Sequence, residues 1–224
     1  MDRPPLSLGS SGEQEAVMRV LVCDDHSLFR EGLRLLLEKL DASMEVTPTG
    51  SAEEALAATR EGMFDLILMD WHMDGLSGVR ALEALRESAP LTRVVVLSGD
   101  RNAELVRTAV EAGAAGFIPK DSPPAQLMQA VRTIADGGVY LPSAGGISAI
   151  RTRDVRDAFP SLTERQADVL RAALRGNSNK LIARQLGISD GTVKTHLRAI
   201  YQELGTRNRT EAVYMAAEQG VRIS

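Results

Sequence analysis

A chain of 224 residues with 44% hydrophobic and 25% charged residues has an ordinary globular composition and is long enough for two modest domains. This composition excludes a fibrous or fully disordered protein, and no apolar run approaches the ~20 residues that span a bilayer. Charge is uneven, because residues 19–141 hold 12 Lys and Arg against 19 Asp and Glu, whereas residues 142–224 hold 13 against 8. The basic second part therefore indicates a polyanionic partner.

The first 18 residues are rich in Pro, Gly and Ser, and we expect a disordered N-terminal extension there. The acidic Glu13 and Glu15 stand where a secretion signal would be basic, so secretion is disfavoured. The single cysteine, Cys23, lies inside an apolar run, which predicts a buried structural thiol and no disulfide within this sequence. These features favour a cytoplasmic protein.

Residues 19–141 alternate short apolar runs with helical patterns. Ser51 and Glu54 have the spacing of a capping box at the start of the second helix. Strand patterns alternating with helices predict an α/β fold, a doubly wound five-stranded parallel sheet covered on both faces. The expected strands are 19–23, 44–49, 66–70, 93–98 and 116–120, and the expected helices are 27–40, 52–61, 77–88, 102–112 and 124–136.

The alternation stops near residue 142, and the charge-dense "IRTRDVRDAFP" follows a Gly- and Ser-rich stretch. We therefore expect a linker over 142–160 and an all-helical domain over 161–224. Thr163 and Gln166 predict a capping box there, and Gly187 predicts a left-handed turn between two helices. Further helix starts are expected after Ser178, Ser189 and Asn208.

Charged and polar residues stand where the predicted parallel strands end. Asp24 and Asp25 follow the first strand, Asp70 ends the third, and Ser98 and Lys120 end the fourth and fifth. Residues at the carboxyl ends of neighbouring parallel strands converge on one crevice. Three carboxylates placed together repel one another unless a hard dication such as Mg²⁺ lies among them. The pattern therefore predicts a Mg²⁺ site.

Three histidines, His26, His72 and His196, are too scattered in the sequence to indicate a zinc site. We interpret His26 as a residue at the start of the first helix.

The segments "CDDH", "LMDWHMDGLSG", "VVVLSGD" and "AGAAGFIPK" resemble the receiver domain of two-component response regulators over about residues 19–141. The resemblance implies a flavodoxin-like receiver in which Asp70 accepts a phosphoryl group from a sensor histidine kinase with Mg²⁺ as cofactor. It also implies that Asp25 binds the metal directly and Asp24 through water. The backbone carbonyl of His72 completes the protein ligands, with Asp70 itself.

The same resemblance assigns roles around the phosphoryl group. Lys120 would pair with the carboxylates or the phosphoryl oxygens, the Ser98 hydroxyl would move to bond the phosphoryl group, and Phe117 would be the switch aromatic. Two positions depart from the family pattern. Asp74 stands where many members have Pro, and Pro119 precedes Lys120 where many members have Pro after it. We expect these changes to alter loop shape and not the chemistry.

Residues 162–213 closely resemble the helix-turn-helix DNA-binding domain of the LuxR and NarL/FixJ regulators. Apolar spacing predicts that Val193, Leu197 and Ile200 face the core, which leaves a polar face on the same helix. We expect that face to enter the major groove of double-stranded DNA. The expected groove residues are Lys194, Thr195 and Arg198, and the expected backbone contacts are Asn179, Lys180 and Arg207.

These features together predict a phosphorylation-controlled transcription regulator that forms a homodimer on phosphorylation and contacts no membrane. An enzyme is disfavoured, because a phosphatase with an aspartyl nucleophile needs Asp-x-Asp after the first strand, and "CDDHSL" lacks it. A pseudo-receiver controlled by protein contacts alone remains open. We further expect the acidic domain to occlude the recognition helix, and Val213, Met215, Ala216 and Ala217 to form a pairing surface on the last helix.

Overall fold

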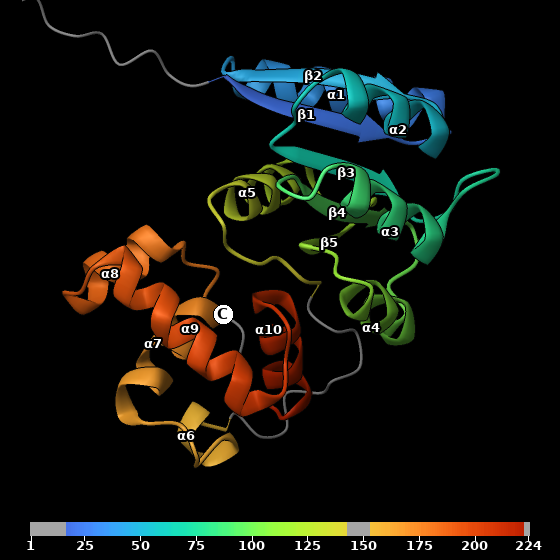
Figure 1. Cartoon of the computed structure of the whole chain (residues 1–224). Helices are drawn as coiled ribbons and strands as arrows, with labels where there is room; N and C mark the ends of the chain where they lie inside the picture. Colours follow the sequence, from blue (N-terminus) through green and yellow to red (C-terminus); the bar gives the residue numbers. More distant parts are fainter. Residues whose placement is uncertain (1–16, 143–152, 222–224) are drawn as a thin grey trace, which may run out of the picture.

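The computed structural model describes residues 17–142 and 153–221, which form a sheet-based unit followed by a helical unit (Figure 1). Nearly all of the expected N-terminal extension, and residues 143–152 of the expected linker, lie outside the described residues. The first unit comprises β1 Met18–Cys23, α1 Ser27–Leu40, β2 Met44–Thr49, α2 Ala52–Glu61, β3 Leu66–Asp70, α3 Gly78–Ser88, β4 Arg93–Ser98, α4 Ala103–Glu111, β5 Gly116–Pro119 and α5 Pro124–Ala135.

The five strands are parallel and lie in the order β2-β1-β3-β4-β5, which confirms the predicted doubly wound fold. Alternate residues of each strand point to opposite faces. Val20 and Val22 of β1 pack with α1 and α5, whereas Leu21 and Cys23 pack with α2, α3 and α4. Because both faces are covered, β1, β3 and β4 read as continuous apolar runs. Pro119 is tolerated because β5 is an edge strand.

Burial of Cys23 confirms the predicted structural thiol. Its side chain is fully buried, and burial raises the pKa of the thiol to about 12.

The helical unit contains a helix-turn-helix formed by its third and fourth helices. Gly187 ends the first of these in the left-handed conformation, with φ of 65°, as predicted. Val193, Leu197 and Ile200 are buried in the core of this unit, which confirms the apolar face. Its helices are α6 Val155–Ala158, α7 Glu164–Leu174, α8 Asn179–Leu186, α9 Asp190–Leu204 and α10 Arg209–Glu218.

The predicted helix caps are present, with one exception. Thr163 and Gln166 form a complete capping box at α7. The Ser51 hydroxyl accepts a hydrogen bond from the Glu54 main-chain N–H, but the Glu54 carboxylate accepts from the N–H of Gly50 and not of Ser51. The reciprocal half of that box is therefore missing. Ser178, Ser189 and Asn208 each accept a main-chain N–H as N-caps.

Part of the segment that we expected to be a linker is helical. Helix α6 lies within residues 153–160, and Val155 and Phe159 are buried in the core of the helical unit. We therefore propose that the second domain begins near Asp154 and not at residue 161. Among the described residues, no helix has both the length and the apolar character needed to cross a bilayer.

Candidate functional site

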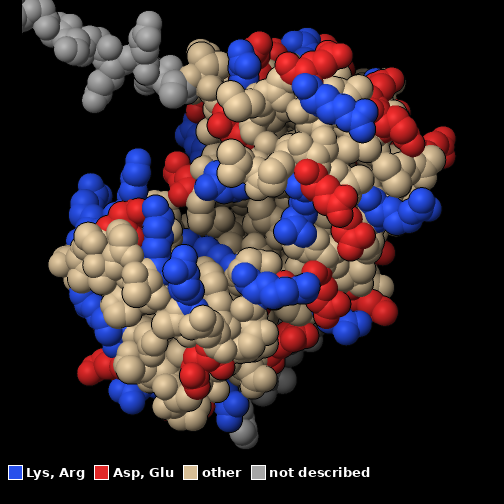
Figure 2. Space-filling view, viewed as in Figure 1, with Lys and Arg blue, Asp and Glu red and all other residues tan. Residues whose placement is uncertain are grey.

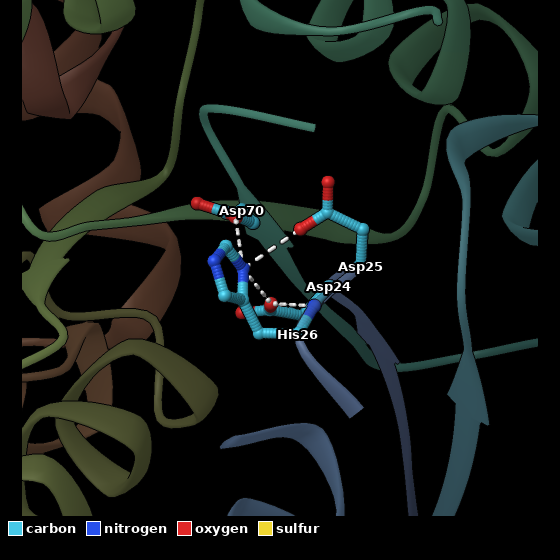
Figure 3. A group of neighbouring side chains, drawn as sticks. All are labelled: Asp24, Asp25, His26 and Asp70. Atoms are coloured by element: carbon cyan, nitrogen blue, oxygen red, sulfur yellow. Dashed lines mark hydrogen bonds and ion pairs between the residues drawn. The ribbon is translucent and has the colours of Figure 1, made fainter. Parts of the chain in front are cut away.

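The carboxyl ends of β1 and β3 bring three carboxylates together. These strands are neighbours in the sheet, so Asp24 and Asp25 after β1 meet Asp70 at the end of β3. Asp24 is fully buried and Asp70 is only 2% exposed. One ligand atom from each of these residues and from His26 lies within 4.8 Å of every other (Figure 3). The convergence predicted from the sequence is therefore found in the structure.

Lys120 partly neutralises this acidic pocket. Its Nζ lies 2.7 Å from Asp24 Oδ2 and 2.7 Å from Asp70 Oδ2. Burial alone would lower the pKa of Lys120, but the two ion pairs outweigh burial and raise it. Burial, together with the charge of Asp24, raises the pKa of Asp70 despite its bond to Lys120. One ammonium group against three carboxylates leaves negative charge in excess.

The donor atoms of the pocket fit a hard dication. Asp25 Oδ1 is shielded from solvent, and apart from the His26 ring nitrogen 2.8 Å away it has no hydrogen-bond partner in the described part of the chain. Asp70 Oδ1 accepts the main-chain N–H of His72 at 3.2 Å, which holds the loop after β3 close to the carboxylates. Oxygen ligands and excess negative charge are what Mg²⁺ requires in a protein.

The carboxyl ends of β4 and β5 supply the remaining residues expected around the phosphoryl group. Ser98 is fully buried, and its main-chain carbonyl accepts the N–H of Lys120 at 2.8 Å, which ties the two loops together. The Ser98 hydroxyl accepts the N–H of Asp100 at 3.0 Å. Phe117 lies three residues before Lys120 and is fully buried in the core beneath α3 and α4.

His26 is a member of the pocket that the sequence interpretation missed. It occupies the N-cap position of α1, as expected, but its side chain makes no capping hydrogen bond. Instead Nδ1 lies 2.8 Å from Asp25 Oδ1, 3.2 Å from Asp24 Oδ1 and 3.8 Å from Asp70 Oδ2. Its position directly after the paired carboxylates in "CDDH" was the available signal.

The departure at Asp74 has a structural effect. Its main-chain N–H donates to Asp25 Oδ2 at 3.0 Å, a bond that proline could not make.

The expected DNA-reading face of α9 is open to solvent. Lys194, Thr195 and Arg198 are all exposed, and the Lys194 ammonium pairs with Asp190 one turn earlier at 2.7 Å. Lys180 on α8 is exposed as well. Figure 2 shows Lys and Arg gathered over the helical unit, whereas Asp and Glu are frequent over the sheet-based unit.

The two units touch through α10, which lies beside α4 (Figure 1). Arg207 donates to the main-chain carbonyl of Glu111 at 2.8 Å, and Thr210 donates to that of Ala115 at 3.3 Å. Tyr214 packs against the core that α4 shares with the sheet.

This contact corrects the expected occlusion of the recognition helix. The acidic and basic units do associate, but α10 is covered and α9 is not, because the donors that reach the receiver carbonyls are Arg207, just before α10, and Thr210 in its first turn. Of the four residues expected to form a pairing surface, Val213 and Ala216 are buried in the core of their own unit, so the expectation is wrong for them. Met215 and Ala217 are half-buried, and Met215 packs against the same core. Arg207 and Asn179, expected at the DNA backbone, are engaged in protein contacts in this conformation.

Comparison with known proteins matches both units to established families. Residues 20–132 match the response regulator receiver domain, and residues 160–216 match the bacterial regulatory proteins of the luxR family. The pairing of these two domains defines a DNA-binding response regulator of a two-component system.

Relatives of known name agree along nearly the whole chain. The nitrate/nitrite response regulator protein NarP of Escherichia coli is 35% identical, over 90% of this chain and 95% of NarP. The transcriptional regulatory protein MctR of Rhizobium johnstonii is 35% identical, over 91% of this chain and 95% of MctR. The receiver domain of the putative response regulator NarL from Mycobacterium tuberculosis superposes with a TM-score of 0.50 at 36% identity, over 54% of this chain and 97% of that domain. The chain belongs to the NarL/FixJ-type response regulators, a family of DNA-binding transcription regulators.

Proposed function

We propose that this chain is switched by phosphorylation of Asp70 and that the phosphoryl group comes from a sensor histidine kinase. The observation that supports this most is the position of Asp70, which ends the central strand beside two further carboxylates and the ammonium of Lys120. A carboxylate can attack phosphorus when nearby cations neutralise the phosphoryl oxygens. Lys120 is one such cation.

Mg²⁺ is the second cation that we propose. Asp24, Asp25, Asp70 and the main-chain carbonyl of His72 would hold it, and when bound it neutralises charge on the phosphoryl oxygens. Lys120 would transfer its ion pair from Asp70 to the phosphoryl group. The Ser98 hydroxyl, now accepting from Asp100, would turn to donate to that group, and Phe117 would report the change as the switch aromatic.

Uptake of phosphate from a small donor tests this proposal. We expect the full chain to gain the mass of one phosphoryl group from acetyl phosphate with Mg²⁺, and to gain none when EDTA removes the metal, because Lys120 alone leaves the pocket anionic. Intact-protein mass spectrometry gives the result. If the chain stays unmodified with both acetyl phosphate and Mg²⁺ present, it behaves as a pseudo-receiver, controlled by protein contacts alone.

We propose further that double-stranded DNA is bound by two copies of the chain, each with α9 in the major groove. One helix offers few base contacts, so two half-sites about one helical turn apart are expected. Phosphorylation would favour the homodimer. Because α10 and α4 are in contact here, we infer that the units separate when the dimer forms and that Arg207 then becomes available to the DNA backbone.

Replacing Arg198 tests the assignment of α9. If the guanidinium reads a base edge, Arg198→Ala should weaken binding to an operator selected in vitro by about 1 to 3 kcal/mol, and it should relax the sequence preference of the protein. The matched variant Lys180→Ala should weaken binding to all duplexes alike. It should also reduce the slope of log affinity against log salt concentration by about one unit, as loss of a phosphate contact does. Anisotropy titrations of the operator and a scrambled duplex at fixed salt give both values. If Lys194, Thr195 and Arg198 can each become Ala without loss of discrimination, α9 does not read the operator.

A further inference from the structure

We propose that His26 is a nitrogen ligand of the acidic pocket, which makes the pocket a mixed nitrogen and oxygen site that accepts borderline transition metal ions such as Ni²⁺ in addition to Mg²⁺. This inference rests on the metal site of the proposed function and names one more of its ligands. Three carboxylates from the receiver pattern account for the oxygen donors. The imidazole beside them is so far without a role.

The distances from His26 Nδ1 to the carboxylates are those expected between ligands of one ion. An octahedral ion with bonds of about 2.1 Å separates adjacent donor atoms by about 3.0 Å and opposite ones by about 4.2 Å. Nδ1 lies 2.8 Å from Asp25 Oδ1, 3.2 Å from Asp24 Oδ1 and 3.8 Å from Asp70 Oδ2. All four groups are therefore close enough to share a single cation, and Figure 3 shows the ring nitrogen facing all three carboxylates.

Main-chain contacts hold this arrangement in place. Asp24 Oδ1 accepts the main-chain N–H of His26 at 2.9 Å, so the residue that supplies a carboxylate also orients the backbone of His26. Asp25 is fixed from its other oxygen by the N–H of Asp74 at 3.0 Å, which leaves Oδ1 directed at the imidazole.

The imidazole and Lys120 lie at different oxygens of Asp24, with Lys120 at Oδ2 and His26 beside Oδ1. At Asp70 both face Oδ2, with the ammonium at 2.7 Å and the imidazole at 3.8 Å, so an ion bound to that oxygen would share it with Lys120. The His26 side chain is 69% exposed and makes no helix-capping bond, so an ion arriving from solvent can reach it. In this structure Nδ1 hydrogen-bonds to Asp24 Oδ1 at 3.2 Å, and a bound ion would replace that contact.

The chemistry of imidazole predicts which ions depend on His26. Imidazole nitrogen suits Ni²⁺, Zn²⁺ and Cu²⁺, and affinities at nitrogen and oxygen sites rise from Mn²⁺ to Ni²⁺. Mg²⁺ prefers oxygen and retains several of its waters, so it gains little from the imidazole. Removal of His26 should therefore lower the affinity for Ni²⁺ much more than the affinity for Mg²⁺.

Metal titration of the full chain and of His26→Gln tests the inference. We expect the variant to lose about tenfold or more in Ni²⁺ affinity, and less than about twofold in Mg²⁺ affinity. Calorimetry at one fixed pH gives the affinities, and the fluorescence of Trp71, which follows Asp70 directly, gives a second readout. With Mn²⁺ as the probe, pulsed electron paramagnetic resonance should detect coupling to ¹⁴N in the natural chain and none in the variant. His196→Gln, in the helical unit, should bind every metal as the natural chain does.

Asp25→Asn distinguishes the possible failures. If this change weakens both Ni²⁺ and Mg²⁺ while His26→Gln weakens neither, or if the ¹⁴N coupling persists without His26, the imidazole is not a ligand and the inference is overturned. If neither metal depends on Asp25, the pocket is not a metal site, and the proposed function loses its cofactor as well.

Discussion

Asp70→Asn should abolish phosphorylation by acetyl phosphate and Mg²⁺ while leaving the fold intact. The amide has no anionic oxygen to attack phosphorus, and no other described carboxylate ends the central strand against Lys120. Intact-protein mass spectrometry should show complete loss of the added phosphoryl group. If the variant is phosphorylated to the same extent as the natural chain, the phosphoryl acceptor is a residue other than Asp70.

The control for this change is Asp121→Asn. Asp121 follows Lys120 directly, but its carboxylate is exposed and pairs with Arg101 outside the pocket. The same chemical substitution there should leave phosphorylation as in the natural chain. A loss in both variants would point to the loop after β5 and not to the nucleophile.

The stability of the Asp70 variant gives an independent check that it folds. Burial raises the pKa of Asp70 above its ordinary 3.8, so the folded state favours the protonated form. The favourable contribution of that protonated form is present below the unfolded pKa and is lost as the pH rises toward the folded pKa. In its ionised form, without divalent metal, Asp70 is a buried carboxylate that repels Asp24, and an amide in its place carries no such charge. Asp70→Asn should therefore unfold at a urea concentration no lower than that of the natural chain.

Most of the receiver could be predicted because its strands obey simple rules. Strands such as Leu66–Asp70 are covered on both faces, so they appear as uninterrupted apolar runs ending in a polar residue. Since parallel strands present the same end at one edge, the position of Asp70, Ser98 and Lys120 in the sequence was enough to place them together. The helical core was predictable for a related reason, because Val193, Leu197 and Ile200 recur at helical spacing.

Features that depend on side-chain direction or on main-chain acceptors were not predictable. The His26 ring could cap α1 or turn into the pocket, and in the structure its Nδ1 lies beside Asp24 and Asp25. The hydrogen bonds from Arg207, Arg209 and Thr210 to the receiver all end on main-chain carbonyls. Every residue has a main-chain carbonyl, so the residue types of the receiver gave no sign of which surface would accept these bonds. The charge imbalance predicted association between the units but not which surface would be covered.

One residue joins the interior of the helical unit to the receiver. Arg209, at the first position of α10, donates through Nη1 to the Gly137 carbonyl after α5 and to Asn179 Oδ1, each at 3.2 Å. Through Nη2 it donates to the carbonyls of Ala173, at 3.2 Å, and Asn177 at the turn between α7 and α8. Burial lowers the pKa of Arg209, so its charge is retained at a desolvation cost that these bonds offset.

Arg209→Ala should lower the free energy of unfolding of the helical unit by about 3 kcal/mol, because it leaves several carbonyls without a charged donor. Amide hydrogen exchange in α7 and α8 should accelerate accordingly, while the Trp71 fluorescence that reports receiver unfolding should change little. Arg207→Ala is the matched control, since that side chain is 72% exposed and its loss should cost at most about 1 kcal/mol. Equal exchange rates in the two variants would contradict the role of Arg209 in stabilising the turn. Faster exchange confined to Arg209→Ala would instead show that the α7–α8 turn depends on a residue at the start of α10, a helix that follows this turn by some thirty residues in the sequence.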